Sequence, residues 1–281
     1  VLHQYNVEHF SKSDIHTMWS QVEIIKSYIR DGHPQAADTA YEKLLSLFAS
    51  EPMLATEICR VADTYLAAGN LEKAEKLYTS VLDKWPGDKQ ILWAKAGMIK
   101  LDIARGNEDS AQSKIDNLLE DFKNHPDLGL ALWRTSEGYY NQALGDQREH
   151  SQAKAKEHFA KVINLGETIR QQLPASSATA EAYFYSAECY YQLGEDQKAL
   201  AYFQQVVEKW PDYEYAWLAQ ARIAKIYKRF AAAGVMPDSE VEVALDGVYE
   251  KLLANYPDCP AAQTARRWLK DKAKPSEGEQ K

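Results

Sequence analysis

Cysteine is scarce in this sequence: the three cysteines, Cys59, Cys189 and Cys259, are an odd number and lie far apart. Small disulfide-stabilised domains carry an even number of closely spaced cysteines, so this pattern favours buried free thiols over a disulfide framework or a zinc site. Long apolar runs are also missing. No stretch approaches the roughly 18 apolar residues of a membrane-spanning helix, so we expect no membrane span.

Positive charge is in deficit. The chain has 33 basic and 41 acidic side chains, a formal net charge of −8 at pH 7. That balance opposes a general attraction to nucleic acid or to an anionic membrane, although a locally basic face remains possible. The chain starts Val1-Leu2-His3 without a charged and then apolar leader, so no signal peptide is visible, and a processed start would look the same.

The motifs of common enzymes are absent as well. The sequence has no GxGxxG, no GxxxxGK[ST], no GxSxG and no HExxH. His150 and His158 lie on one predicted helical hairpin but are too far apart for the usual i and i+4 pair of metal ligands. We therefore predict no catalytic residue, no metal site and no cofactor, and we expect that the protein is not an enzyme.

The sequence does contain an internal repeat. One copy occupies residues 62–88, and a second copy with the same spacing occupies residues 187–212. The matching positions are Ala62, Tyr65, Gly69, Ala74, Tyr78, Val81 and Trp85-Pro86 in the first copy, and Ala187, Tyr190, Gly194, Ala199, Phe203, Val206 and Trp210-Pro211 in the second.

Each copy is typical of two antiparallel helices. Gly69 and Gly194 are expected to end the first helix, because glycine adopts the left-handed cap conformation without strain. Ala74 and Ala199 let the second helix approach closely, and the closing proline stops it because proline cannot donate a helical hydrogen bond. A single hairpin cannot bury its apolar faces, so stacked copies are expected.

This pattern resembles the tetratricopeptide repeat, a family of helical hairpins of roughly 34 residues. The resemblance implies an all-α, right-handed superhelical solenoid of about six antiparallel helix hairpins plus a C-terminal capping helix. Weaker copies extend it along the chain. The expected segments are a lead-in at 1–13, hairpins at about 14–49, 52–85, 88–124, 127–173, 176–210 and 212–256, a cap at 259–273, and a disordered tail at 274–281.

Three hairpins share an aromatic-proline ending that an acidic residue follows. The phrases around Trp85-Pro86, Trp210-Pro211 and Tyr256-Pro257 are similar to repeats of bacterial cell-envelope proteins of the TolA-binding-protein and outer-membrane-assembly lipoprotein type. This resemblance implies a cell-envelope assembly factor in the periplasm, but the acylated N-terminal cysteine of the lipoprotein branch is absent. A cytoplasmic location stays open.

In tetratricopeptide stacks the first helices of the repeats line a concave groove. The resemblance therefore implies a groove, basic at its ends and aromatic in the middle, that holds an extended or helical segment of another protein. An ordinary hydrated groove is the alternative. The predicted groove residues are Lys26, Arg30, Asp63, Lys100, Thr135, Tyr139, Phe184, Glu188, Tyr191, Lys225, Lys228 and Arg229.

The sequence thus favours a non-enzymatic scaffold that binds a protein or peptide. One alternative is the cell-envelope assembly factor, with self-association possible. Another is a helical accessory domain of an enzyme, or a small-molecule binder. The insertions at 146–151 and 231–238 are second candidates for a binding surface, because segments that depart from a repeat often carry function.

Overall fold

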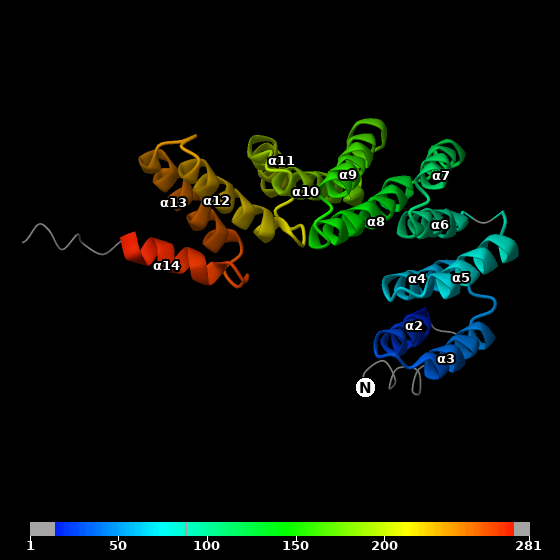
Figure 1. The fold of residues 1–281 in the computed structure, drawn as a ribbon. Coiled ribbons are helices and arrows are strands. Elements are labelled where there is room, and N and C mark those ends of the chain that lie inside the picture. The colour runs from blue at the N-terminus through cyan, green and yellow to red at the C-terminus, as the bar shows by residue number, and fades with distance from the viewer. Residues whose placement is uncertain (1–14, 88, 273–281) are drawn as a thin grey trace, which may run out of the picture. The chain divides into compact units, whose positions relative to one another are not determined.

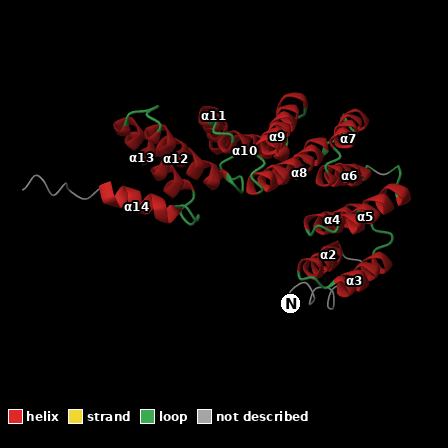
Figure 2. Cartoon of the chain, in the orientation of Figure 1, coloured by secondary structure: helices red, strands yellow, loops and turns green. Residues whose placement is uncertain are grey.

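The computed structural model describes residues 15–87 and 89–272. The predicted lead-in segment at 1–13, residue Asp88 and the predicted tail at 274–281 lie outside the described residues. Within the described part of the chain, 13 helices and no strand occur, which confirms the all-α prediction (Figures 1 and 2). None of these helices has an apolar stretch long enough to cross a membrane.

The helices follow one another as antiparallel pairs with short turns. They are α2 (Ile15–Arg30), α3 (Pro34–Leu47), α4 (Leu54–Ala67), α5 (Leu71–Lys84), α6 (Ile91–Arg105), α7 (Glu108–Asp121), α8 (Leu128–Arg148), α9 (Gln152–Gln172), α10 (Ser177–Gln192), α11 (Asp196–Lys209), α12 (Ala216–Ala232), α13 (Asp238–Asn255) and α14 (Ala262–Lys272).

The chain divides into two compact units, residues 1–142 and residues 143–281, and the division falls inside α8. In the N-terminal unit α2 packs on α3, α4 on α5 and α6 on α7, and the first helix α4 also contacts the first helices α2 and α6. In the C-terminal unit α9 to α14 pack each against the next along the chain. This consecutive packing is the arrangement of a repeat solenoid.

The predicted glycine caps are confirmed in both clean repeats. Gly69 and Gly194 have φ of 77° and 76°, the left-handed conformation that glycine adopts without strain. The amide N–H of Asn70 donates to the carbonyl of Tyr65 at 2.9 Å, and that of Glu195 donates to the carbonyl of Tyr190 at 2.9 Å. These are the hydrogen bonds of a Schellman motif, which turns the chain back into the second helix.

The second helices pack as the repeat pattern predicts. Ala74 and Ala199 are 0% exposed, as are the aromatic rings of Tyr78 and Phe203 one turn further on. Tyr78 also fixes the neighbouring helix: a Cβ atom placed on Gly97 of α6 would lie 2.2 Å from Cε1 of Tyr78. Only glycine at this position lets α6 approach the tyrosine ring so closely.

The two predicted insertions take different forms. The first one lengthens helices, because α8 and α9 have 21 residues each whereas α10 has 16 and α11 has 14. The second one lengthens α12 to Ala232 and adds a turn that exposes Val235, whose exposed fraction is 59%. Each insertion therefore changes the turn between the two helices of its own hairpin, α8 and α9 in the first case and α12 and α13 in the second.

Candidate functional site

The predicted basic residues of the first hairpin are engaged by one carboxylate. Lys26 donates to Oε1 of Glu23 at 2.6 Å, and Arg30 lies 3.6 Å from Oε2 of the same residue. Arg60 of α4 also donates to Glu23, at 3.1 Å, and pairs with the buried Glu57 at 2.8 Å. Burial acts to raise the pKa of Glu23, but these cations lower it below its usual value. The positive charge at this end is thus largely neutralised.

Asp63 of α4 is the centre of a second ion network in the N-terminal unit. It accepts hydrogen bonds from the Tyr78 hydroxyl at 2.8 Å and from Lys100 of α6 at 3.0 Å, and Arg134 of α8 lies 3.8 Å from its other oxygen. Lys100 also lies 3.8 Å from Glu137. Two predicted groove residues, Asp63 and Lys100, therefore bind each other and link consecutive first helices.

Five of the predicted groove residues are buried in the protein. Thr135, Tyr139 and Phe184 are 0%, 1% and 3% exposed, and Glu188 and Tyr191 are 3% and 9% exposed. The Thr135 hydroxyl donates to the carbonyl of Ala131 one turn earlier, at 3.1 Å. Their side chains fill the space between helices, so they offer no surface to a partner, and the surface proposed below leaves them out.

In the C-terminal unit a buried carboxylate holds an arginine of α12. Glu188 of α10 is 3% exposed and accepts two hydrogen bonds from Arg222, from Nε at 2.6 Å and from Nη2 at 2.9 Å. This bidentate geometry fixes the plane of the guanidinium group. The same guanidinium lies over the ring of Tyr191, 4.8 Å from its centroid.

Tyr191 also holds a second arginine of the same helix. The guanidinium carbon of Arg229 lies 3.7 Å from the centroid of the Tyr191 ring, and Nη1 donates to the Tyr191 carbonyl at 3.2 Å. Asp196 at the start of α11 also forms an ion pair with Arg229, with 2.9 Å between Nη1 and Oδ1. The two arginines of α12 therefore have fixed positions around one aromatic ring.

The two lysines between these arginines are exposed. Lys228 lies over the rings of Tyr249 at 5.6 Å and Trp268 at 5.3 Å. Lys225 has no ion pair with another described residue. We call Arg222, Lys225, Lys228 and Arg229 the α12 basic face, since they follow one side of α12 at helical spacing.

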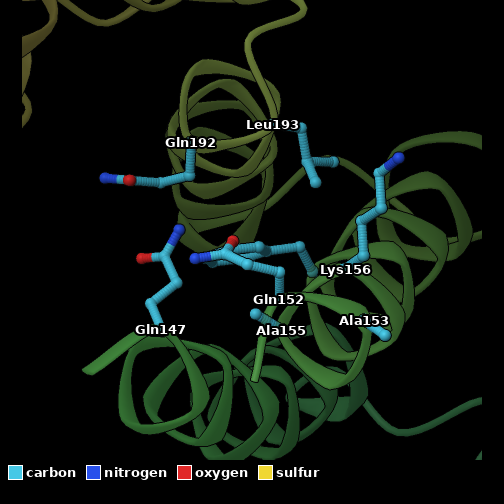
Figure 3. Close-up of a pocket in the computed structure, with 8 residues that line it drawn as sticks. Gln147, Gln152, Ala153, Ala155, Lys156, Gln192 and Leu193 are labelled. Carbon is cyan, nitrogen blue, oxygen red and sulfur yellow. The ribbon is translucent and has the colours of Figure 1, made fainter. Parts of the chain in front are cut away.

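A small pocket lies at the edge of the C-terminal unit, where α8 ends, α9 begins and α10 ends (Figure 3). Its volume is about 250 Å³. The lining is mixed, with three glutamine side chains and Lys156 beside apolar groups. The lining residues are Gln147, Gln152, Ala153, Ala155, Lys156, Phe159, Gln192 and Leu193.

The two histidines of the fourth hairpin lie in different surroundings. Nδ1 of His158 lies 2.7 Å from Oδ2 of Asp146, a contact that ties the start of α9 to the end of α8. His150 sits exposed in the turn with a φ of 60°. In the range 15–272, leaving aside residue 88, no group of three or more histidine, cysteine, aspartate or glutamate side chains could hold a metal ion.

Several charged residues of these networks were missed by the sequence pattern, namely Glu23, Arg60, Arg134, Arg222 and Asp196. Most lie one helical turn from a predicted groove residue or at the start of a second helix. Opposite charges at i and i+3, such as Glu57 and Arg60, were the available signal. The pairs between different helices left no such signal, because their members are more than 30 residues apart in the chain.

Comparisons with known proteins agree with the repeat pattern. Two family models described as tetratricopeptide repeat match the chain, one over residues 60–99 and the other over residues 181–213. These ranges contain both of the clean copies found in the sequence, residues 62–88 and residues 187–212. A comparison with curated proteins gave no match.

Among solved structures, one similar chain is a tetratricopeptide repeat protein from Parabacteroides merdae, with 14% sequence identity, a TM-score of 0.38, and coverage of 90% of this chain and 97% of that chain. Another is the tetratricopeptide repeat domain of P58(IPK), with 16% identity, a TM-score of 0.25, and coverage of 95% of this chain and 70% of that chain. The two family matches show that the chain contains tetratricopeptide repeats, and the repeated helix pairs follow the same pattern.

Proposed function

We propose that this protein is a non-enzymatic scaffold that binds an acidic segment of another protein along the α12 basic face. Tetratricopeptide repeats serve in general as protein-interaction scaffolds. The observation that carries the finer proposal is the fixed position of Arg222 and Arg229 on either side of Lys225, which has no counter-charge among the described residues.

The arginines are preorganised for binding. Glu188, Asp196 and the Tyr191 ring hold both guanidinium groups in place before any partner arrives. Ordering a long side chain at an interface costs about 0.5–1.5 kcal/mol, and here that cost has already been met in folding. Both hydrogen bonds of Arg229 use Nη1, and because arginine carries five N–H donors, this guanidinium keeps donors for a partner.

Charge explains why the segment should be acidic. The protein has a formal net charge of −8, so the row of cations on α12 is a local positive region on a negatively charged molecule. Lys225 supplies the uncompensated positive charge of that row. A partner with carboxylates at matching intervals would gain charge-assisted hydrogen bonds, and a basic partner would be repelled.

Site-specific cross-linking tests the position of this surface. We would place a photoreactive amino acid at Lys225 on α12 and, as the matched control, at Lys251, which is an exposed lysine of α13. Cross-linked products from native extract would be identified by mass spectrometry. We expect a product from position 225 that position 251 does not give, and that fades as the salt concentration rises because its contacts are ionic.

Charge reversal then tests the chemistry. Lys225→Glu should weaken the identified complex by roughly threefold to tenfold and mainly slow association, because a charge at the edge of an interface acts through steering. Lys251→Glu should leave affinity within experimental error. Identical cross-links from both positions, or equal affinity for both variants, would show that the α12 basic face is not the interface.

A further inference from the structure

The pocket between α8, α9 and α10 has a polar rim built from three carboxamides. Gln147 comes from the last turn of α8, Gln152 from the first turn of α9 and Gln192 from the last turn of α10. Figure 3 shows the side chains of Gln147 and Gln152 reaching into the space below Gln192. None of these three amide groups has a hydrogen-bond partner among the described residues, so each keeps a donor and an acceptor for a ligand.

The floor and one wall of the pocket are apolar. Phe159 and Ala155 of α9 are 1% and 2% exposed and close the inner end. Leu193, directly after α10, forms part of the wall, and in Figure 3 its side chain points toward α9. An aliphatic group that entered the pocket would leave water and contact these side chains.

The size of the pocket limits what can enter. Sites for drug-sized ligands and cofactors have volumes of roughly 300–1,000 Å³. At about 250 Å³ this pocket is smaller and suits one side chain with its adjoining peptide groups. In addition, no side-chain hydrogen bond caps α9 at Ser151, so the first turn of α9 presents backbone N–H donors at the same place.

We propose that this pocket binds one aliphatic side chain of a peptide, with the carboxamides of Gln147, Gln152 and Gln192 paired to the peptide groups on either side. Backbone peptide groups carry one donor and one acceptor each, and a carboxamide can satisfy both. The inference relies on the proposed function only in taking the ligand to be a peptide, since no charged group is needed.

Two neighbouring residues at the end of α10 serve different contacts. Tyr191 holds Arg229 of α12 with its ring and its carbonyl, and the next residue, Gln192, forms the pocket rim. Consecutive residues of a helix point in different directions, so the pocket and the α12 basic face are separate surfaces. The longer α8 and α9 of the first insertion supply two of the three glutamines of the pocket.

The test uses the full chain and N-acetyl-leucine N′-methylamide, which has one aliphatic side chain between two peptide groups. Side-chain amide signals of the three glutamines would be followed by NMR during titration. For a ligand of this size we expect a dissociation constant of about 1 mM. N-acetyl-glycine N′-methylamide, which lacks the side chain, should bind at least tenfold more weakly.

Two alanines of α9 provide a matched pair of variants. Ala153 lines the pocket and Ala160 does not, and both are exposed, so neither replacement by leucine disturbs the core. Ala153→Leu should fill the pocket and abolish the shifts caused by the leucine probe, whereas Ala160→Leu should leave them unchanged. Gln192→Ala should weaken binding about twofold to tenfold through the lost hydrogen bonds.

The opposite results would overturn the assignment. These are an absence of shifts at tens of millimolar probe, equal shifts from the leucine and glycine probes, or unchanged binding in Ala153→Leu. Because the probe is uncharged, Lys225→Glu should not affect its binding. A failure of the pocket would therefore leave the cross-linking result at position 225 intact, and a failure of the α12 basic face would leave the titration intact.

Discussion

The contact between Gly97 and Tyr78 predicts that Gly97→Ala strongly destabilises the N-terminal unit. The added Cβ would lie 2.2 Å, 2.4 Å and 2.7 Å from Cε1, Cζ and Cδ1 of Tyr78. Carbon atoms normally pack at about 3.5–4.0 Å, so the ring would have to retreat by more than 1 Å. The ring is 0% exposed and its hydroxyl donates to Asp63 at 2.8 Å, so it has no free space to enter.

The expected magnitude combines three effects. Overpacking of this severity costs up to about 3 kcal/mol. Displacement of the ring also weakens the hydrogen bond to Asp63, worth about 1 kcal/mol. The better helix propensity of alanine returns about 1 kcal/mol. We therefore expect Gly97→Ala to lower the free energy of unfolding by about 3 kcal/mol.

Gly138→Ala is the matched control in the same unit. A Cβ atom at Gly138 would lie 3.4 Å from Cδ1 of Ile103, an ordinary contact, so the helix propensity of alanine should make this variant neutral or slightly more stable. Urea unfolding followed by circular dichroism would measure both variants. If Gly97→Ala were as stable as Gly138→Ala, the close approach of α6 to the Tyr78 ring would be refuted.

Two further predictions concern buried groups. Arg222→Met should lower the free energy of unfolding in urea by about 3 kcal/mol, because it leaves the buried carboxylate of Glu188 uncompensated. The double variant with Glu188→Met should regain most of this stability. An unchanged loss in the double variant would contradict the ion-pair explanation. Cys259 should react first with a thiol reagent such as DTNB, and Cys59 and Cys189 only after unfolding, because burial raises the pKa of both thiols. Rapid labelling of Cys59 or Cys189 in a folded Cys259→Ser variant would contradict this order.

The sequence was sufficient for the repeat architecture because the signals that encode it are local. A glycine cap such as Gly69 or Gly194 needs only the hydrogen bonds of its own helix end, and the small and aromatic positions of a hairpin repeat within one copy. These features predicted an all-α solenoid of helix pairs, which the described residues confirm. The resemblance to cell-envelope proteins stays a prediction.

Local patterns were less informative where a repeat diverges. Asp102 occupies the aromatic position of the third hairpin, and the structure shows how it is accommodated: Ser110 and Lys114 donate to its carboxylate at 2.7 Å and 2.6 Å. Burial acts to raise the pKa of Asp102, but these hydrogen bonds lower it below its usual value. The spacing of the repeat positions could not give these partners, because Ser110 and Lys114 lie on the next helix.

Tertiary structure alone decided which predicted groove residues reach a surface. Thr135 and Tyr139 follow the same register as Lys100 and Asp63, yet they are buried while the other two form an ion pair. The partners of Arg222 and Arg229 lie more than 30 residues earlier in the chain. Such contacts depend on how one helix is rotated against the next, and that rotation follows from packing between repeats, which the spacing within a repeat does not specify.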